Sequence, residues 1–207
     1  MFSKVFVFDL GRVIFDYDLN KLYEAFSKYS VKPFLFKDVE SFIYANKELI
    51  FQYEKGQISS IDFYKKIVNV LSLENLSFEE FSAIWNDIFT PMQSTIDLIN
   101  SLSKKCELAI LSNTNQLHFD YLYKKYSDFF SNFKKLHLSY LMNARKPEKE
   151  IYEQVIKIHN IQPENMFFTD DIYENICSAR LAGIKAFQFK NCSKLEQDLK
   201  TFGLELE

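Results

Sequence analysis

The sequence contains few of the residues that interrupt regular structure. Only four glycines and four prolines occur among 207 residues, well below average usage, which excludes a collagen-like or low-complexity chain. Hydrophobic residues make up 47% and charged residues 26%, values that exclude an intrinsically disordered chain. The length therefore accommodates one sizeable domain, or one domain that carries a smaller insert.

Cysteine is also scarce. The three cysteines, Cys106, Cys177 and Cys192, are odd in number and match none of the paired spacings of zinc sites. This pattern excludes a disulfide scaffold and favours free thiols in a reducing, cytoplasmic setting.

The chain has neither a basic excess nor a long apolar run. Its 25 basic and 28 acidic residues give a net charge of −3, whereas a nucleic-acid-binding protein needs a basic stripe. No stretch approaches the roughly twenty apolar residues that cross a bilayer. The first apolar run is too short for a signal peptide and ends at Asp9. We therefore expect neither nucleic acid nor a membrane as partner.

Short apolar runs that stop at polar residues recur along the chain. They cover residues 4–8, 108–111, 165–169 and 184–189, with a weaker candidate at 136–138. Such unbroken runs suit strands that are buried on both faces of a parallel sheet. Helical periodicity lies between them at residues 94–103, 148–159 and 172–182. The alternation predicts right-handed βαβ units and an α/β fold with a parallel sheet.

Residues 18–89 depart from this alternation. They contain helix-like segments at 19–30, 39–55, 61–71 and 78–89 and no convincing strand. Ser59 and Ser77 are suited to begin two of these helices, and Gly56 to end another. Pro91 marks the return of the chain. We predict an all-helical insert at residues 17–90 within a core domain made of residues 1–16 and 91–207.

Polar side chains stand where the predicted strands stop. Asp9 follows the first strand, Ser112 the second, and the pair Asp170 and Asp171 a later one, while Lys146 lies in a loop between them. Ligands of open α/β sheets bind beyond the carboxyl ends of the strands. Because carboxylates repel phosphate, a divalent cation must lie among them if the substrate is a phosphate ester.

The segments that carry these residues resemble the four motifs of the haloacid dehalogenase superfamily. In chain order they are Phe8-Asp9-Leu10-Gly11-Arg12-Val13-Ile14, Leu111-Ser112-Asn113-Thr114-Asn115, Arg145-Lys146-Pro147-Glu148 and Phe168-Thr169-Asp170-Asp171-Ile172-Tyr173-Glu174-Asn175. The resemblance covers nearly the whole chain and implies a Rossmann-like core with the helical insert as a cap domain. Within the superfamily, the chain looks most like bacterial sugar-phosphate phosphatases, such as glucose-1-phosphate phosphatases, and the N-terminal phosphatase domain of soluble epoxide hydrolases.

This resemblance implies roles for individual residues. Asp9 is the expected nucleophile, which forms an aspartyl-phosphate that water then hydrolyses. Mg²⁺ is expected on the side chains of Asp9 and Asp171 and the backbone carbonyl of Gly11, a set of oxygen ligands that this ion prefers. Ser112, together with the backbone N–H groups that follow it, is expected to bind the phosphoryl oxygens.

Further residues are expected to support this centre. Asn113 joins the phosphate-binding segment, and Lys146 neutralises the charge of the intermediate. Adjacent carboxylates at a strand end point opposite ways, so only one of Asp170 and Asp171 easily reaches the ion. The position of Asn175 favours Asp171 as the ligand, which leaves Asp170 to orient the backbone or Lys146.

One position departs from the pattern of the superfamily. Most of its phosphatases carry a second Asp two residues after the nucleophile as general acid, which is typically worth about 10²–10⁴-fold, but this chain has Gly11 there. Either the leaving group needs little protonation, as an anomeric sugar oxygen does, or another acid replaces the missing one. Asp16 is the candidate from the sequence. Arg12 adds a positive charge that could bind a second anionic group.

The helical insert is expected to select the substrate. Tyr53 and Glu54 match a cap segment near the site of the similar phosphatases, and both could hydrogen-bond sugar hydroxyls. The three histidines, His118, His137 and His159, are expected to have structural roles.

The sequence therefore predicts a Mg²⁺-dependent phosphatase that acts on a small phosphorylated metabolite, a sugar phosphate, as a monomer or homodimer. One alternative is a member of the family that binds a phosphate ligand or regulates without turnover, which Gly11 makes credible. The other is a 2-haloacid dehalogenase. That chemistry needs no metal, and the charge of Asp170 and Asp171 opposes a carboxylate substrate.

Overall fold

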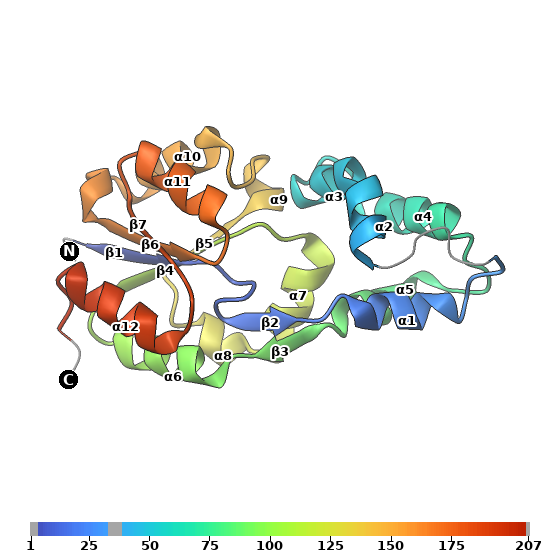
Figure 1. Cartoon of the computed structure of the whole chain (residues 1–207), viewed down its shortest axis with the longest axis horizontal. Coiled ribbons are helices and arrows are strands. Elements are labelled where there is room, and N and C mark those ends of the chain that lie inside the picture. The colour runs from blue at the N-terminus through green and yellow to red at the C-terminus, as the bar shows by residue number, and fades with distance from the viewer. Residues whose placement is uncertain (1–3, 33–38, 206–207) are drawn as a thin grey trace.

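The chain forms a parallel sheet with helices on both faces and a group of helices beyond the carboxyl ends of its strands (Figure 1). The computed structural model describes residues 4–32 and 39–205. Residues 1–3 and 206–207 of the predicted core domain, and residues 33–38 of the predicted insert, lie outside these ranges.

The strands of the sheet coincide with the five apolar runs found in the sequence. They are β1 (Val5–Phe8), β4 (Glu107–Ser112), β5 (Lys135–Leu138), β6 (Met166–Asp170) and β7 (Lys185–Gln188). Their order is β5-β4-β1-β6-β7, and all neighbouring strands are parallel. The predicted α/β fold with a Rossmann-like parallel sheet is therefore confirmed.

The side chains of β1 build two cores, one on each face of the sheet. Phe6 and Phe8 belong to one buried cluster, whereas Val5 and Val7 belong to the other. Alternate residues of a strand point to opposite faces, so a run that is apolar throughout needs cover on both. Figure 1 shows this cover, with α10 and α11 on one face and α6 and α12 on the other.

The helices of the core include those that the sequence periodicity predicts. They are α6 (Gln93–Leu102), α7 (Gln116–Lys125), α8 (Ser127–Phe130), α9 (Ser139–Met142), α10 (Lys149–His159), α11 (Tyr173–Leu181) and α12 (Cys192–Thr201), with a 3₁₀ turn at Pro163–Asn165. The predicted helices at 94–103, 148–159 and 172–182 match α6, α10 and α11 and differ only at their ends.

The helical insert has a core of its own. Its helices are α1 (Asn20–Ser27), α2 (Val39–Ala45), α3 (Lys47–Glu54), α4 (Ser60–Leu71) and α5 (Phe78–Asn86). Ser59 accepts the N–H of Asp62 at the start of α4, and Ser77 forms a capping box with Glu80 at the start of α5. Gly56 follows α3 with a φ of +68°. These helix ends agree with the predicted caps.

A two-stranded ribbon connects the insert to the core, and the sequence did not predict it. β2 (Phe15–Tyr17) pairs antiparallel with β3 (Phe89–Pro91). The predicted helix at 78–89 is therefore too long, because α5 ends at Asn86 and β3 begins at Phe89. Three residues are too few for a strand periodicity, and the ribbon depends on pairing between segments far apart in the sequence.

Two features agree with the composition. Cys106, Cys177 and Cys192 are all free thiols. Among the residues that the structure describes, no helix has the length and apolar character needed to span a bilayer.

Candidate active site

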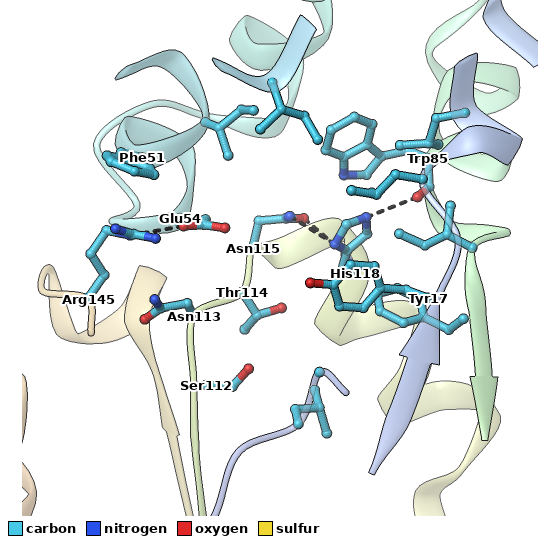
Figure 2. A pocket seen from close by; sticks show the side chains of 18 of the residues that line it. Tyr17, Phe51, Glu54, Trp85, Ser112, Asn113, Thr114, Asn115, His118 and Arg145 are labelled. Carbon is cyan, nitrogen blue, oxygen red and sulfur yellow. Dashed lines mark hydrogen bonds and ion pairs between the residues drawn. The ribbon is translucent and has the colours of Figure 1, made fainter. Parts of the chain in front are cut away.

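The polar segments noted in the sequence meet beyond the carboxyl ends of three strands. Asp9 directly follows β1, Ser112 ends β4 and Asp170 ends β6. A cavity of about 330 Å³ lies between these strand ends and the helical insert (Figure 2). Its walls include Asp9, Ser112, Lys146 and Asp171. Parallel strands bring their carboxyl ends to one edge, which explains how remote segments form one site.

A buried ammonium group joins two carboxylates. Nζ of Lys146 lies 2.8 Å from Oδ1 of Asp9 and 2.6 Å from Oδ2 of Asp170. It also donates a hydrogen bond to the carbonyl of Leu111 at 2.9 Å. Burial disfavours the ammonium form, but the two carboxylates outweigh it, so the pKa of Lys146 is raised and the group carries its charge.

Asp9 has one engaged oxygen. Oδ1 accepts the N–H of Leu10 at 2.6 Å in addition to Lys146. Within the described ranges, Oδ2 takes part in no hydrogen bond or ion pair, and it is therefore the oxygen available to a ligand. Burial raises the pKa of Asp9 well above its usual value, and the Lys146 charge opposes that rise.

The adjacent carboxylates of Asp170 and Asp171 differ in whether they are buried or line the cavity. Asp170 is fully buried, and its two oxygens accept from Lys146, from the amide of Asn175 at 2.9 and 3.0 Å, and from the N–H of Ile172 at 2.8 Å. Asp171 lines the cavity. Burial raises its pKa, and the neighbouring Asp170 charge adds to this. Asp171 is thus the member of the pair that faces the cavity.

These carboxylates fit a divalent cation. One oxygen each of Asp9, Asp170 and Asp171 lies within 4.8 Å of the others. Hard cations such as Mg²⁺ prefer carboxylate and carbonyl oxygens and keep some of their water. Because Asp170 is saturated by hydrogen bonds, Asp9 and Asp171 are the side chains with an oxygen left for an ion.

The residues that follow β4 form the opposite wall of the cavity. The amide of Asn113 accepts the N–H of Lys146 and donates to its carbonyl, both at 2.8 Å. The N–H of Thr114 donates to Ser139 at 3.0 Å. Asn113 therefore holds the backbone of Lys146, while Ser112 presents its side chain at the cavity wall.

An ion pair joins the helical insert to the core at the rim of the cavity. Nε of Arg145 lies 3.0 Å from Oε2 of Glu54, and the Arg145 guanidinium lies 3.7 Å from the ring centre of Phe51 (Figure 2). All three residues line the cavity. Burial raises the pKa of Glu54, and Arg145 opposes this. The insert thus contacts the residue that precedes Lys146.

Two further contacts fix the end of α3 to the same part of the core. Nζ of Lys55 lies 3.0 Å from Oε1 of Glu148. A Cβ on Gly56 would lie 2.1 Å from the carbonyl oxygen of Tyr140. Only glycine allows so close an approach with a positive φ.

His118 links the other side of the insert to α7. Its ring stacks on Trp85 with centroids 5.2 Å apart, Nε2 bonds the carbonyl of Trp85 at 2.9 Å, and Nδ1 bonds the amide of Asn115 at 3.1 Å (Figure 2). Burial lowers its pKa to about 4. His118 is therefore neutral at pH 7, and it joins α7 to the insert in the wall of the cavity. The Nε2 atoms of His137 and His159 form a hydrogen bond with each other at 2.9 Å.

Besides the buried Asp170, three of the predicted site residues lie outside the lining of the cavity. Tyr53 is buried in the insert, where its hydroxyl lies 2.8 Å from Oγ of Ser60. The Asp16 side chain is 58% exposed and lies 3.6 Å from that of Arg12, which is also half-exposed. The structure thus brings Asp9, Ser112, Lys146 and Asp171 together and holds these three residues apart from them.

Tyr17 is a cavity residue that the sequence analysis missed. It lies on β2 next to Asp16, and its ring packs against Gly11. Nothing in the local sequence marks it, since the ribbon that orients it was not predicted.

Comparisons with known proteins agree with this geometry. Residues 4–183 match the family described as haloacid dehalogenase-like hydrolase. The chain therefore belongs to the haloacid dehalogenase-like hydrolases.

Two proteins of Bacteroides thetaiotaomicron and one of Porphyromonas gingivalis are similar to this chain over most of its length. D-ribitol-5-phosphate phosphatase of Bacteroides thetaiotaomicron is 30% identical over 205 residues, which are 95% of this chain and 96% of that protein. A HAD family enzyme of the same organism, solved in complex with magnesium and inorganic phosphate, is 29% identical with a TM-score of 0.79, over 90% of this chain and 94% of that chain. A HAD-like hydrolase of Porphyromonas gingivalis shares the fold at 23% identity, with a TM-score of 0.81 over 97% and 98%.

Proposed function

We propose that the chain is a Mg²⁺-dependent phosphatase that hydrolyses a small phosphorylated metabolite through an aspartyl-phosphate on Asp9. The observation that carries this proposal is the group of Asp9, Lys146 and Asp171 at one end of the cavity, with Ser112 in the same wall. A buried cation and a free carboxylate oxygen in one site suit attack on a phosphate ester. Magnesium and inorganic phosphate bound to a similar enzyme support it.

The proposed magnesium site uses the side chains of Asp9 and Asp171 and the backbone carbonyl of Gly11. Asp170 and Asn175 then have a positioning role, because the Asn175 amide donates to Asp170, which also accepts a hydrogen bond from Lys146. The bound ion supplies positive charge that offsets the repulsion between Asp9 and the phosphate.

In the first step, a carboxylate oxygen of Asp9 forms a bond to phosphorus while the bond from phosphorus to the leaving-group oxygen breaks. Ser112 donates a hydrogen bond to a phosphoryl oxygen, and Lys146 stabilises the charge on the phosphoryl group. In the second step, water attacks phosphorus while the bond from phosphorus to the Asp9 oxygen breaks, which regenerates the Asp9 carboxylate. One water proton leaves on the hydrogen phosphate, and the other balances the proton that the leaving-group oxygen takes up to become an alcohol. Dividing one hard displacement into two easier ones is the advantage of a covalent intermediate.

A sugar or polyol phosphate is the proposed substrate class, which the ribitol-phosphate relative supports. The insert would close the site and exclude water. Glu54 lies in the cavity wall, where it could receive a substrate hydroxyl. Tyr53 would act by holding α3, and the exposed Arg12 could attract a second anionic group. The free thiols favour a cytoplasmic setting, for a monomer or homodimer.

Phosphate release from a panel of sugar and polyol phosphates, including D-ribitol 5-phosphate, tests this function. Wild-type protein should release phosphate when Mg²⁺ is present, and EDTA should stop this release. Asp9→Asn should abolish release, whereas Asp128→Asn, at an exposed carboxylate on α8, should not. Activity on 2-haloacids that survives EDTA would instead establish the dehalogenase alternative.

A binding or regulatory role without turnover is the second candidate, and Gly11 at the usual acid position favours it. Calorimetry with the same panel and Mg²⁺ separates the two. Tight binding of a phosphate ester by wild-type protein that releases no phosphate would support the binding role and contradict the phosphatase.

A further inference from the structure

Most phosphatases of the superfamily that this chain resembles carry an aspartic acid two residues after the nucleophile, and this chain has no carboxylic acid at that position. As the bond to phosphorus breaks, negative charge develops on the leaving-group oxygen, and an alkoxide without a hydrogen-bond donor is a poor leaving group. Gly11 offers no side chain for this purpose. Another donor must reach the same place if alkyl phosphates are hydrolysed at a useful rate.

The ring of Tyr17 occupies the space beside Gly11. A Cβ added to Gly11 would lie 3.1 Å from Cε1 of Tyr17 and 3.7 Å from Cδ1. The ring therefore fills the space beside position 11, since a Cβ there would have to push it aside by a few tenths of an ångström. Tyr17 also lines the cavity together with Asp9 and Asp171, and Figure 2 shows its ring below that of His118.

The surroundings of Tyr17 hold its phenol in this position. The Arg12 guanidinium lies 4.7 Å from the ring centre and donates to the Tyr17 carbonyl at 3.4 Å. On its other side the ring packs edge-on against Phe89 at 6.4 Å. Pairing between β2 and β3 places Tyr17 opposite Phe89. The side chain is thus fixed by the ribbon that joins the insert to the core.

From this geometry we infer that the Tyr17 hydroxyl donates a hydrogen bond to the leaving-group oxygen and thereby performs the task of the acid that Gly11 replaces. The inference rests on the proposed phosphatase function. A phenol, with an ordinary pKa of about 10, keeps its proton at neutral pH and is a donor there. Burial raises the pKa of the Tyr17 phenol, a hydrogen bond and the positive charge of Arg12 oppose this rise, and the negative charges of Asp171 and Asp9 add to it.

Asp16, the acid suggested by the sequence, is the rival. Its carboxylate accepts the backbone N–H of Tyr17 at 2.9 Å and lies 3.6 Å from Arg12. It is more than half exposed and does not line the cavity. Its contacts position Tyr17 and Arg12 and do not reach the leaving group.

Leaving-group dependence tests the inference. The values of kcat/KM for Tyr17→Phe, Asp16→Asn and wild-type protein are measured with two substrates, the best alkyl phosphate of the panel and p-nitrophenyl phosphate. The second substrate has a good leaving group that needs no donor. Phe keeps the ring beside Gly11 and removes only the hydroxyl. Tyr44→Phe, at an exposed tyrosine of the insert, is the matched control.

We expect Tyr17→Phe to lower kcat/KM for the alkyl phosphate by about 10²-fold and for p-nitrophenyl phosphate by less than about threefold. Asp16→Asn and Tyr44→Phe should affect both substrates equally. Equal losses in Tyr17→Phe, or no loss, would overturn the inference while phosphate release by wild-type protein keeps the proposed function. A selective loss in Asp16→Asn would assign the donor to Asp16. Wild-type protein that releases no phosphate would overturn both proposals.

Discussion

The Lys146 ammonium lies 2.8 Å from the Asp9 carboxylate although the two residues are far apart in the sequence. Both side chains are buried, and Lys146 is shared with Asp170 at 2.6 Å. In a buried place, charges of opposite sign stabilise each other only while each keeps its partner. The same contact that prepares the proposed phosphate site therefore also bears on the stability of the core.

Replacing Lys146 tests this double role. Lys146→Met leaves Asp9 and Asp170 as neighbouring buried carboxylates without a cation, so we expect a loss of about 3 kcal/mol or more in the free energy of unfolding. Urea denaturation measures it. Lys149→Met, which removes an exposed lysine paired with Glu153, should leave the stability unchanged. A Lys146→Met protein as stable as wild type would contradict the buried ion pair.

The second prediction concerns the ion pair between Glu54 and Arg145, which joins the insert to the core. Both side chains are largely buried, at 19% and 16% exposure. A double-mutant cycle with Glu54→Gln and Arg145→Gln should give a coupling free energy of about 1 kcal/mol in urea unfolding. We also expect each single variant to raise KM, because a looser insert closes less well over the substrate.

The same cycle separates two roles of Glu54. If its main partner is Arg145, the double variant should raise KM no further than either single one. If Glu54 instead binds a substrate hydroxyl, Glu54→Gln should raise KM on its own, and deoxy analogues lacking that hydroxyl should be insensitive to the change. Additive effects on stability would contradict the ion pair.

Acidification should weaken the contact made by His118. Burial lowers its pKa from 6.5 to about 4, so between these values the unfolded chain binds a proton that the folded protein does not. The contribution of the buried, neutral His118 to the free energy of unfolding is then complete above pH 6.5 and is lost as the pH falls toward 4. The stability difference between wild type and His118→Gln should shrink over this window by up to about 3 kcal/mol. A difference that stays constant with pH would contradict a buried neutral histidine.

Much of the sheet and of the site was predictable because both depend on local sequence. Residues 5–8 are apolar throughout and stop at Asp9, which is sufficient to predict a buried strand and a polar residue at its end. Parallel strands then bring Asp9, Ser112 and Asp170 to one edge whatever the loops do. The capping serines Ser59 and Ser77 likewise act within one turn of their own helix.

What escaped prediction depends on contacts between segments distant in the sequence. The pairing of Phe15 with Pro91 has no local signal, and without that ribbon Tyr17 could not be placed beside Gly11. The contact of Arg145 with Glu54 joins two separate parts of the chain in the same way. Tyr53 and Glu54 are adjacent in α3, yet only Glu54 lines the cavity, because neighbouring residues of a helix point in different directions.

The measurement that most directly tests the central claim is mass spectrometry of the protein quenched in acid during turnover of an alkyl phosphate with Mg²⁺. The account predicts a phosphoryl group attached to the peptide that contains Asp9, absent with EDTA and absent in Asp9→Asn. Turnover at the wild-type rate in Asp9→Asn, or a phosphoryl group on a different peptide, would contradict it.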